Sequence, residues 1–346
     1  MKALFPYMKF IFAAAALYVI SACSSHEGEG LLPEPAPPAV TVSHLHISDG
    51  VVTGVDEGYS DIVFPAGVKS IQAAAFSGNR DITRLTLNDG IEIIGPDAFF
   101  DSSIAEINFP SSLKEIGEYA FYNCVNLTAA DMGGTGVTIL PEGAFGYSGL
   151  RSVTLPQALT EIGIQAFLKT SGLEYIDIPA NVNSLGNEAF RETGATAVNL
   201  PNNISFLDQR VFYMCPNLKE VRTYGGITVD VPGSSIQSYC FTGCPEIVVF
   251  EIPGNIRRIS QGLLNGSYKL ERIVVPANVN YIDFSAFDNS GIRNVTVEPV
   301  TPPSARLAGS KWYGFPEDVS VIQVPAGTAE QYKAAPGWSE FAGKIQ

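Results

Sequence analysis

Residues 150 to 167, Leu-Arg-Ser-Val-Thr-Leu-Pro-Gln-Ala-Leu-Thr-Glu-Ile-Gly-Ile-Gln-Ala-Phe, form the stretch that decides the fold of this chain. The stretch contains two apolar segments, of which the first ends at Pro156 and the second ends at Phe167. The same arrangement returns at residues 173 to 190, where Pro179 and Phe190 hold the equivalent places. A repeat of about two dozen residues is typical of a solenoid, in which each unit buries its apolar face against its neighbours.

The repeat can be followed along the chain by the position after each first apolar segment. Nine of the eleven steps between successive markers are 22 or 23 residues long. These markers are Pro65, Asn88, Pro110, Gly133, Pro156, Pro179, Pro201, Tyr224, Pro253, Pro276, Glu298 and Pro325. The aromatic residue of the second segment keeps the same phase at Phe76, Phe99, Phe121, Phe145, Phe167, Phe190, Phe212, Phe241 and Phe287, with Leu264 in one place. Two independent markers in phase indicate a true repeat.

Each apolar segment has a physical interpretation. Val153 and Leu155 alternate with polar residues, which predicts a half-buried strand, and Pro156 ends that strand because it has no N–H to donate. The second segment predicts a short extended piece. We expect Gly163 to turn it in a left-handed conformation, so that Phe167 points inward. Stacked coils about 4.8 Å apart would then place each phenylalanine on the next.

The spacing Leu-x-x-Ile-x-Ile-Pro, followed by Ile-Gly-x-x-Ala-Phe-x-x-Cys, resembles the BspA-type leucine-rich repeat family over residues 45 to 325. The resemblance implies a mostly β, right-handed solenoid of about twelve coils of 22 to 23 residues, with a parallel sheet on one face and short turns on the other. It also implies a surface-exposed protein that binds macromolecules and is not an enzyme. The sequence departs from the family pattern at residues 133–137, 225–235 and 261–265.

The first 22 residues have the pattern of a signal peptide. Lys2 and Lys9 precede an apolar stretch that is too short to span a bilayer. Val19-Ile20-Ser21-Ala22-Cys23 resembles the lipobox of bacterial lipoproteins, which implies cleavage before Cys23 and lipidation of its thiol. An ordinary secretory signal is the alternative. The proline-rich residues 23–39 predict an extended tether, and they loosely resemble the export signals of Bacteroidetes surface lipoproteins. We therefore expect an outer-membrane lipoprotein exposed at the cell surface.

The remaining residues divide into three parts. Residues 40–58 are expected to form an N-terminal cap, with a hairpin around Asp49-Gly50. Residues 59–325 carry the repeats. Residues 326–346 are expected to close the other end with one or two helical turns, and with Tyr332, Trp338 and Phe341 over the last coil.

The composition restricts the classes of partner. Hydrophobic residues make up 46% of the 346 residues, which is enough for a large core, and the formal net charge is −14. That charge, without a run of Lys or Arg, disfavours nucleic acid or an anionic membrane surface as the main partner. Contact with the membrane is expected through the lipid anchor alone.

Motifs for chemistry are absent from the sequence. The histidines are His26, His44 and His46. His44 and His46 share one face of an expected strand, but no acidic or cysteine partner is spaced to complete a metal site. We predict no cofactor, no metal and no enzymatic activity.

Cysteines recur at one register of the repeat. Cys124, Cys215 and Cys244 each follow the repeat phenylalanine by three residues. They are interpreted as buried thiols, with a disulfide between Cys215 and either Cys240 or Cys244 as the alternative.

The outward positions of the predicted sheet remain as the candidate for function. The proposed partner-binding face consists of Glu106, Asn108, Asp131, Tyr175, Asp177 and Arg222. On this basis we expect a monomeric, adhesin-like scaffold that binds a protein or extracellular-matrix partner. A glycan-binding protein of a nutrient-uptake system is the alternative, and a merely solvated face is the simplest interpretation.

Overall fold

The computed structural model describes residues 44–226, 231–305, 312 and 314–346. The chain divides into two units, Met1–Ala39 and Val40–Gln346, and all described residues belong to the second. The expected signal peptide, the lipidated Cys23 and the tether therefore lie outside the described residues. So do residues 227–230 of the insertion.

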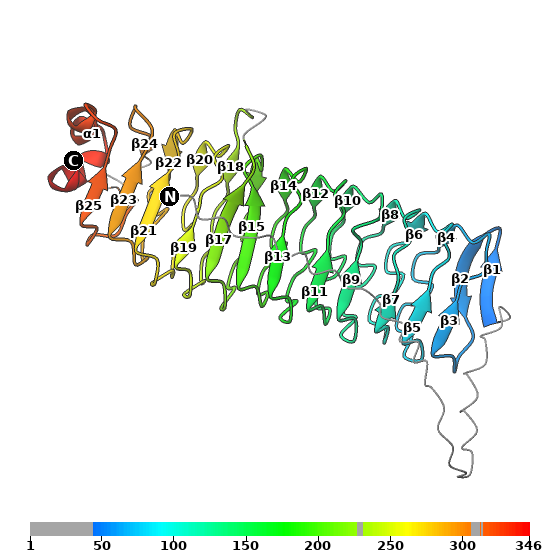
Figure 1. The fold of residues 1–346 in the computed structure, drawn as a ribbon. Helices are drawn as coiled ribbons and strands as arrows, with labels where there is room; N and C mark the ends of the chain where they lie inside the picture. The colour runs from blue at the N-terminus through cyan, green and yellow to red at the C-terminus, as the bar shows by residue number, and fades with distance from the viewer. Residues whose placement is uncertain (1–43, 227–230, 306–311, 313) are drawn as a thin grey trace, which may run out of the picture. The chain divides into compact units, whose positions relative to one another are not determined.

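The first apolar segment of each repeat forms a strand, and these strands make the first ladder (Figure 1). All its pairings are parallel, and they form four short sheets: β3-β5-β7, β9-β11, β13-β15-β17-β19 and β21-β23-β25. The strands are β3 (Asp61–Val63), β5 (Arg84–Thr86), β7 (Glu106–Ile107), β9 (Ala129–Asp131), β11 (Ser152–Thr154), β13 (Tyr175–Asp177), β15 (Ala197–Pro201), β17 (Glu220–Tyr224), β19 (Val249–Phe250), β21 (Arg272–Val275), β23 (Asn294–Val297) and β25 (Val321–Gln323).

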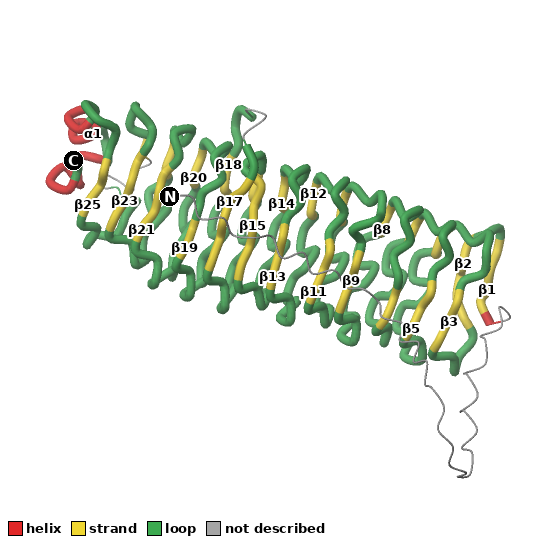
Figure 2. The backbone as a smooth tube through the Cα atoms, viewed as in Figure 1, coloured by secondary structure: helices red, strands yellow, loops and turns green. Residues whose placement is uncertain are grey.

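The second apolar segment forms a second ladder of two-residue strands, which loops separate from the first (Figure 2). This ladder has one break, between β8 and β10, and its second part runs without interruption from β10 to β24. Its strands are β4 (Ser70–Ile71), β6 (Ile93–Ile94), β8 (Glu115–Ile116), β10 (Ile139–Leu140), β12 (Glu161–Ile162), β14 (Ser184–Leu185), β16 (Phe206–Leu207), β18 (Ser235–Ile236), β20 (Arg258–Ile259), β22 (Tyr281–Ile282) and β24 (Ser304–Ala305). Each coil contributes one strand to each ladder. The result is a parallel solenoid of about eleven turns, close to the expected twelve.

The phenylalanines of the repeat form one continuous column in the core. The rings of Phe76, Phe99, Phe121, Phe145, Phe167, Phe190, Phe212 and Phe241 stack in that order with centroid distances of 5.0 to 5.7 Å. Leu264 interrupts the stack, which resumes where Phe287 packs on Phe315 at 5.2 Å. The predicted column is confirmed, and Phe315 is a further member that the repeat pattern did not reveal.

The expectation for Gly163 was wrong. Its φ is not positive, and the left-handed residues of this turn are Gln165 and Lys169, with φ values of 52° and 56°. Gly163 is required for a different reason, because a Cβ at this position would lie 2.8 Å from the carbonyl oxygen of Leu140 in the preceding coil. Gly186 approaches Gly163 in the same way, since its Cβ would lie 2.7 Å from the carbonyl carbon of Gly163. These glycines allow one coil to pack against the next.

The two ends of the described unit carry elements that differ from the coils. β1 (Leu45–Ser48) and β2 (Val51–Val55) pair antiparallel around Asp49-Gly50, and β2 continues the second ladder. At the other end, α1 (Ala329–Ala334) and the 3-10 helix η2 (Trp338–Lys344) bury the side chains of Tyr332, Trp338 and Phe341. Within the described residues, no helix has the length and apolarity needed to cross a bilayer.

We predict that Phe167→Ala lowers the free energy of unfolding by about 3–5 kcal/mol, because it opens a cavity in a fully buried stack. Phe167→Asp should prevent folding, since it would bury an unpaired charge. Chemical denaturation measures both effects. Thr154→Ala, on the exposed face of β11, is the control and should change stability little. An unchanged denaturation midpoint for Phe167→Asp would contradict the column.

We predict that Gly163→Ala lowers the free energy of unfolding by about 1–3 kcal/mol, because the added methyl group overlaps backbone atoms of the preceding coil. Gly134→Ala is the matched control, since its Cβ would have no neighbour within 4 Å and its φ is not positive. Thermal unfolding of the two variants distinguishes close packing from a general effect of replacing glycine. Equal melting temperatures would show that close approach at Gly163 does not matter.

Candidate interaction surfaces

The six residues of the proposed partner-binding face all lie on or beside the first ladder, but they do not form one cluster. Glu106 is in β7 and Asn108 follows it, Asp131 is in β9, Tyr175 and Asp177 are in β13, and Arg222 is in β17. These strands belong to three different hydrogen-bonded sheets. Because β7 and β17 are five coils apart, the set spans roughly 24 Å.

At the N-terminal end of this set, the side chains already form hydrogen bonds with other residues of the protein. Asn108 accepts a hydrogen bond from the backbone N–H of Leu87 at 2.6 Å and donates to its carbonyl oxygen at 3.1 Å. The side-chain amide of Asn108 therefore continues the hydrogen bonding of the first ladder. Glu106 accepts a hydrogen bond from Nε of Arg84 at 2.9 Å, and Arg84 also lies 3.5 Å from Asp61. This exposed ion pair raises the pKa of Arg84.

A hydrogen-bonded polar group lies at the middle of the first ladder. The amide of Asn199 in β15 donates to the hydroxyl oxygen of Tyr175 at 2.5 Å and lies 3.5 Å from a carboxylate oxygen of Asp177. The Tyr175 side chain is exposed, at 53% of its full accessible area. Asn199 therefore fixes two of the expected residues relative to each other. Asn199 is not one of the six residues of the proposed partner-binding face.

Arg222 lies one strand further along. Its Nε donates to Glu220 at 2.9 Å and its Nη1 is 3.8 Å from Glu251. Tyr224, at the end of the same strand, donates its hydroxyl to the carbonyl oxygen of Ile178 two coils away. Desolvation, followed by the charge of Asp177, raises the pKa of Tyr224 to about 12. A tyrosine that reaches back across the neighbouring strand was not anticipated, because sequence spacing does not show side-chain direction.

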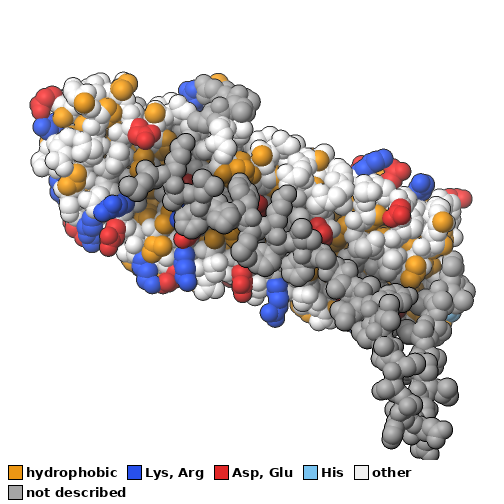
Figure 3. All heavy atoms as spheres, viewed as in Figure 1, with side chains coloured by type: hydrophobic (Ala, Val, Ile, Leu, Met, Phe, Trp, Pro, Cys, Tyr) orange, Lys and Arg blue, Asp and Glu red, His pale blue; other side chains and the backbone are white. Residues whose placement is uncertain are grey.

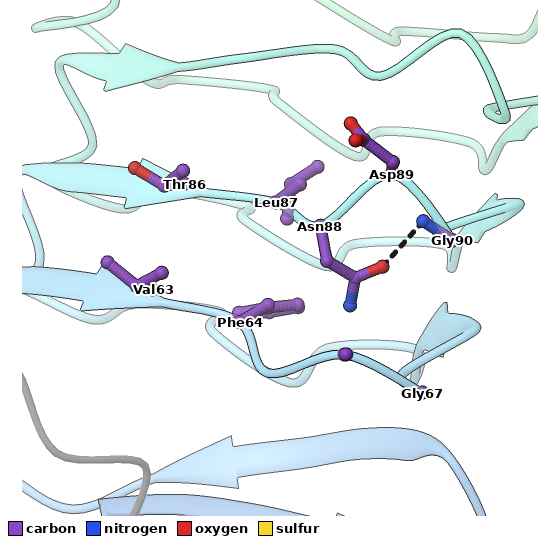
Figure 4. A pocket seen from close by; sticks show the side chains of 9 residues that line it. Val63, Phe64, Gly67, Thr86, Leu87, Asn88, Asp89 and Gly90 are labelled. Carbon is purple, nitrogen blue, oxygen red and sulfur yellow. Dashed lines mark hydrogen bonds between the residues drawn. The ribbon is translucent and has the colours of Figure 1, made fainter.

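A shallow hollow of about 410 Å³ lies at the ends of β3 and β5 (Figure 4). Its apolar surface comes from Val63, Phe64 and Leu87, and Asp89 stands at its rim. Asn88 closes one side, since it accepts a hydrogen bond from Gly90 N–H at 2.6 Å and donates to Pro65. A second hollow of about 280 Å³ lies beside it between Arg84 and Asn108. Both are open depressions that could accept a side chain of a partner.

Charges are distributed in small groups over the face drawn in Figure 3. Where side chains are coloured there, acidic and basic residues occur singly or next to each other among neutral ones. This distribution agrees with the low charged content of 16%. It gives no large field of one sign that would steer a highly charged polymer.

The four cysteines of the solenoid are buried free thiols. Cys215 and Cys244 occupy equivalent positions in successive coils, and their thiols lie close enough to influence each other. Each donates to the carbonyl oxygen of a phenylalanine, Cys215 to Phe190 at 3.2 Å and Cys244 to Phe212 at 3.1 Å, whereas Cys240 donates to the carbonyl oxygen of Asp208 at 2.8 Å. Of the two partners considered for Cys215, the structure therefore places Cys244 next to it. Burial raises the pKa of Cys124 to about 11, so this thiol is a poor nucleophile.

The interpretation of His44 and His46 requires a correction. The hairpin brings Asp56 to both rings, at 2.9 Å from Nε2 of His46 and 3.6 Å from Nδ1 of His44. An acidic partner therefore exists, and sequence spacing does not reveal it because the antiparallel pairing of β1 with β2 brings these residues together. Tyr59 stacks on His44 with a centroid distance of 3.7 Å. Across the residues that the structure describes, no group of three or more His, Cys, Asp or Glu could hold a metal ion.

Two ladders, a column of repeat phenylalanines and turns of 22 or 23 residues define a leucine-rich repeat solenoid. The model of the BspA type leucine rich repeat region matches residues 56–147, 138–230 and 226–301, with 6 copies of the repeat. The chain belongs to this family.

Bacterial repeat proteins are among the solved structures of similar fold. A leucine-rich repeat protein from Bacteroides ovatus is 20% identical, with a TM-score of 0.48, and the match covers 89% of this chain and 99% of that one. A leucine rich cell surface protein from Faecalibacterium prausnitzii is 20% identical, with a TM-score of 0.39 and coverage of 87% and 98%. The pneumococcal vaccine antigen PcpA is 16% identical, with a TM-score of 0.42 and coverage of 85% and 81%. No curated protein matches the chain.

We predict that the pKa of Asp56 lies below its ordinary value of 3.8, chiefly because His46 donates a hydrogen bond to the carboxylate. A carboxyl group with a lowered folded-state pKa stabilises the fold above its ordinary pKa, and this stabilisation is lost as the pH falls through the folded-state value. An NMR titration of the carboxyl carbon measures the pKa directly. His46→Gln should move it back toward 3.8. A pKa of Asp56 that does not respond to His46→Gln would contradict the contact.

Proposed function

We propose that this protein is a cell-surface lipoprotein whose solenoid is a scaffold for binding a protein or extracellular-matrix partner, in the manner of an adhesin. Membership of the BspA-type family supports a binding scaffold. The lipobox-like residues before Cys23 support a lipid anchor in the outer membrane. The proposal assigns no catalytic role, no cofactor and no metal to the chain, and it treats the protein as a monomer.

The observation that carries the proposal is the polar group at the centre of the first ladder. Tyr175, Asn199 and Asp177 are held together by hydrogen bonds, and Arg222 lies one strand away. Tyrosine and arginine are the residue types that most often dominate the binding energy of protein interfaces. Because hydrogen bonds already join these side chains to neighbouring ones, less conformational entropy remains to be lost when a partner binds. Glu106, Asn108 and Asp131 extend the proposed face toward the N-terminal coils.

Glycan binding is a second candidate, and Tyr224 is the observation that favours it. Together with Tyr175 it places two tyrosines near Asp177, directly before the insertion that begins at Gly225. An aromatic ring beside a carboxylate and an amide offers both an apolar face and hydrogen-bonding groups to a sugar. In this case the protein would capture polysaccharide for a nutrient-uptake system.

We predict that a variant combining Tyr175→Ala, Asp177→Asn and Arg222→Ala loses at least tenfold in affinity for the natural partner, because hot-spot truncations cost about 2 kcal/mol or more each. The measurement is surface plasmon resonance of the purified protein against purified matrix proteins, with a polysaccharide array in parallel. A matched control carries Glu161→Ala and Ser184→Ala on the outward positions of β12 and β14. Unchanged affinity of the triple variant would refute the proposed face. Binding confined to the polysaccharide array would establish the second candidate in place of the first.

A further inference from the structure

A second group of aromatic side chains lies on the turns that follow the second ladder. It consists of Phe100, Tyr119, Tyr122 and Tyr147, and we call it the tyrosine cluster. Phe100 stacks on Tyr122 with a centroid distance of 5.5 Å, Tyr119 meets Tyr122 edge to face at 5.6 Å, and Tyr147 lies 5.2 Å from Tyr122. All four residues are at least partly exposed. The cluster is separate from the proposed partner-binding face, whose residues belong to the first ladder.

Glycines in the following coil make room for two of these rings. A Cβ at Gly143 would lie 2.3 Å from a ring carbon of Tyr119, and a Cβ at Gly146 would lie 2.8 Å from a ring carbon of Tyr122. The two tyrosines therefore occupy the space that side chains at 143 and 146 would fill. Each of these two rings therefore packs against the backbone of the following coil.

In two nearby places, a basic side chain of this chain lies against an exposed or partly exposed tyrosine ring. The ammonium group of Lys169 lies over the ring of Tyr147 at 5.2 Å, and it is 3.7 Å from Glu192. One coil further, the guanidinium of Arg191 lies 5.5 Å from the centroid of Tyr213 and pairs with Glu188 at 2.9 Å. In both places a cation lies between an aromatic ring and a carboxylate.

Tyr119 has the ring and the carboxylate without the cation. The hydroxyl of Tyr119 donates to Glu142, and the exposed acid Glu118 precedes it in the chain. Among the side chains that the structure describes, no Lys or Arg lies over the ring of Tyr119 or Tyr122. The carboxylates of Glu118 and Glu142 would attract a basic side chain at short range.

From this arrangement we infer that the tyrosine cluster binds a lysine or arginine side chain of a protein partner, against the ring of Tyr119 and the carboxylate of Glu142. The inference rests on the proposed role as a protein-binding scaffold and adds a second contact surface with a defined chemistry. A cation over an aromatic face gains more free energy where water is partly excluded, and the half-buried rings provide such a place. The partner segment is therefore expected to be basic.

The test uses isothermal titration calorimetry of the full-length protein with a glycine-serine peptide that carries four arginines. The matched ligand is the same peptide with citrulline, a neutral residue of the same shape, in place of arginine. We expect the arginine peptide to bind more tightly than the citrulline peptide. Tyr119→Ala and Glu142→Gln should each weaken its binding about threefold to thirtyfold. Glu142→Gln keeps an acceptor for the Tyr119 hydroxyl, so it tests the charge without removing the contact.

Tyr239→Ala is the control variant, since that ring also occupies the space beside a glycine but its hydroxyl accepts from Gln261 at 2.7 Å rather than meeting an acid. It should bind the arginine peptide as the wild type does. Equal affinity for the two peptides, or full affinity of both Tyr119→Ala and Glu142→Gln, would overturn the inference. So would competition by a neutral oligosaccharide, which would assign the rings to sugar.

The variant that combines Tyr175→Ala, Asp177→Asn and Arg222→Ala distinguishes this inference from the proposed function. It should keep its affinity for the arginine peptide while losing the natural partner. If it loses the peptide instead, the peptide binds at the first ladder and the tyrosine cluster is not the site.

Discussion

The close approach of each coil to the next is the constraint on which the rest of the structure depends. At Gly163 the backbone of one coil leaves no space for a methyl group beside Leu140 of the preceding coil. The same spacing brings the repeat phenylalanines into a stack with about 5 Å between ring centroids. A coil has no other place to bury its apolar side chains, so its fold depends on its two neighbours. The features that could bind a partner are arranged by this stacking, since each involves residues from two or three coils.

Much of the fold could be predicted because a repeat multiplies a weak local signal. One Pro and one Phe predict little, but the same pair in phase along the chain indicates a ladder and a core column. The turn conformation could not be predicted in this way. Gln165 and Lys169 adopt positive φ values without being glycine, and the pattern suggested Gly163 instead. The reason is physical, because glycine is selected here by the space between coils, and that space is not visible within one repeat.

The candidate surfaces were predictable only in part. The outward positions of the first ladder follow from strand alternation, so Tyr175, Asp177 and Arg222 were found. The role of Asn199, which joins two of them, depends on side-chain direction. The contact of Asp56 with His46 depends on hairpin register. The sequence does contain a signal for the tyrosine cluster. Tyr119 and Gly143 lie 24 residues apart, so they occupy equivalent places in successive coils, and a tyrosine next to a glycine predicts that the ring fills the space above the glycine.

The two ladders differ in continuity, and this difference has a mechanical consequence. The first ladder is divided between β7 and β9, between β11 and β13, and between β19 and β21, whereas the second is unbroken from β10 to β24. Strand pairing therefore resists stretching more on the side of the second ladder than on the side of the first. From β10 onward, bending is easiest when the coils open along the first ladder, with the second ladder acting as a spine. The outward groups of β11 and β13 are therefore joined by packing of the coils and not by strand pairing.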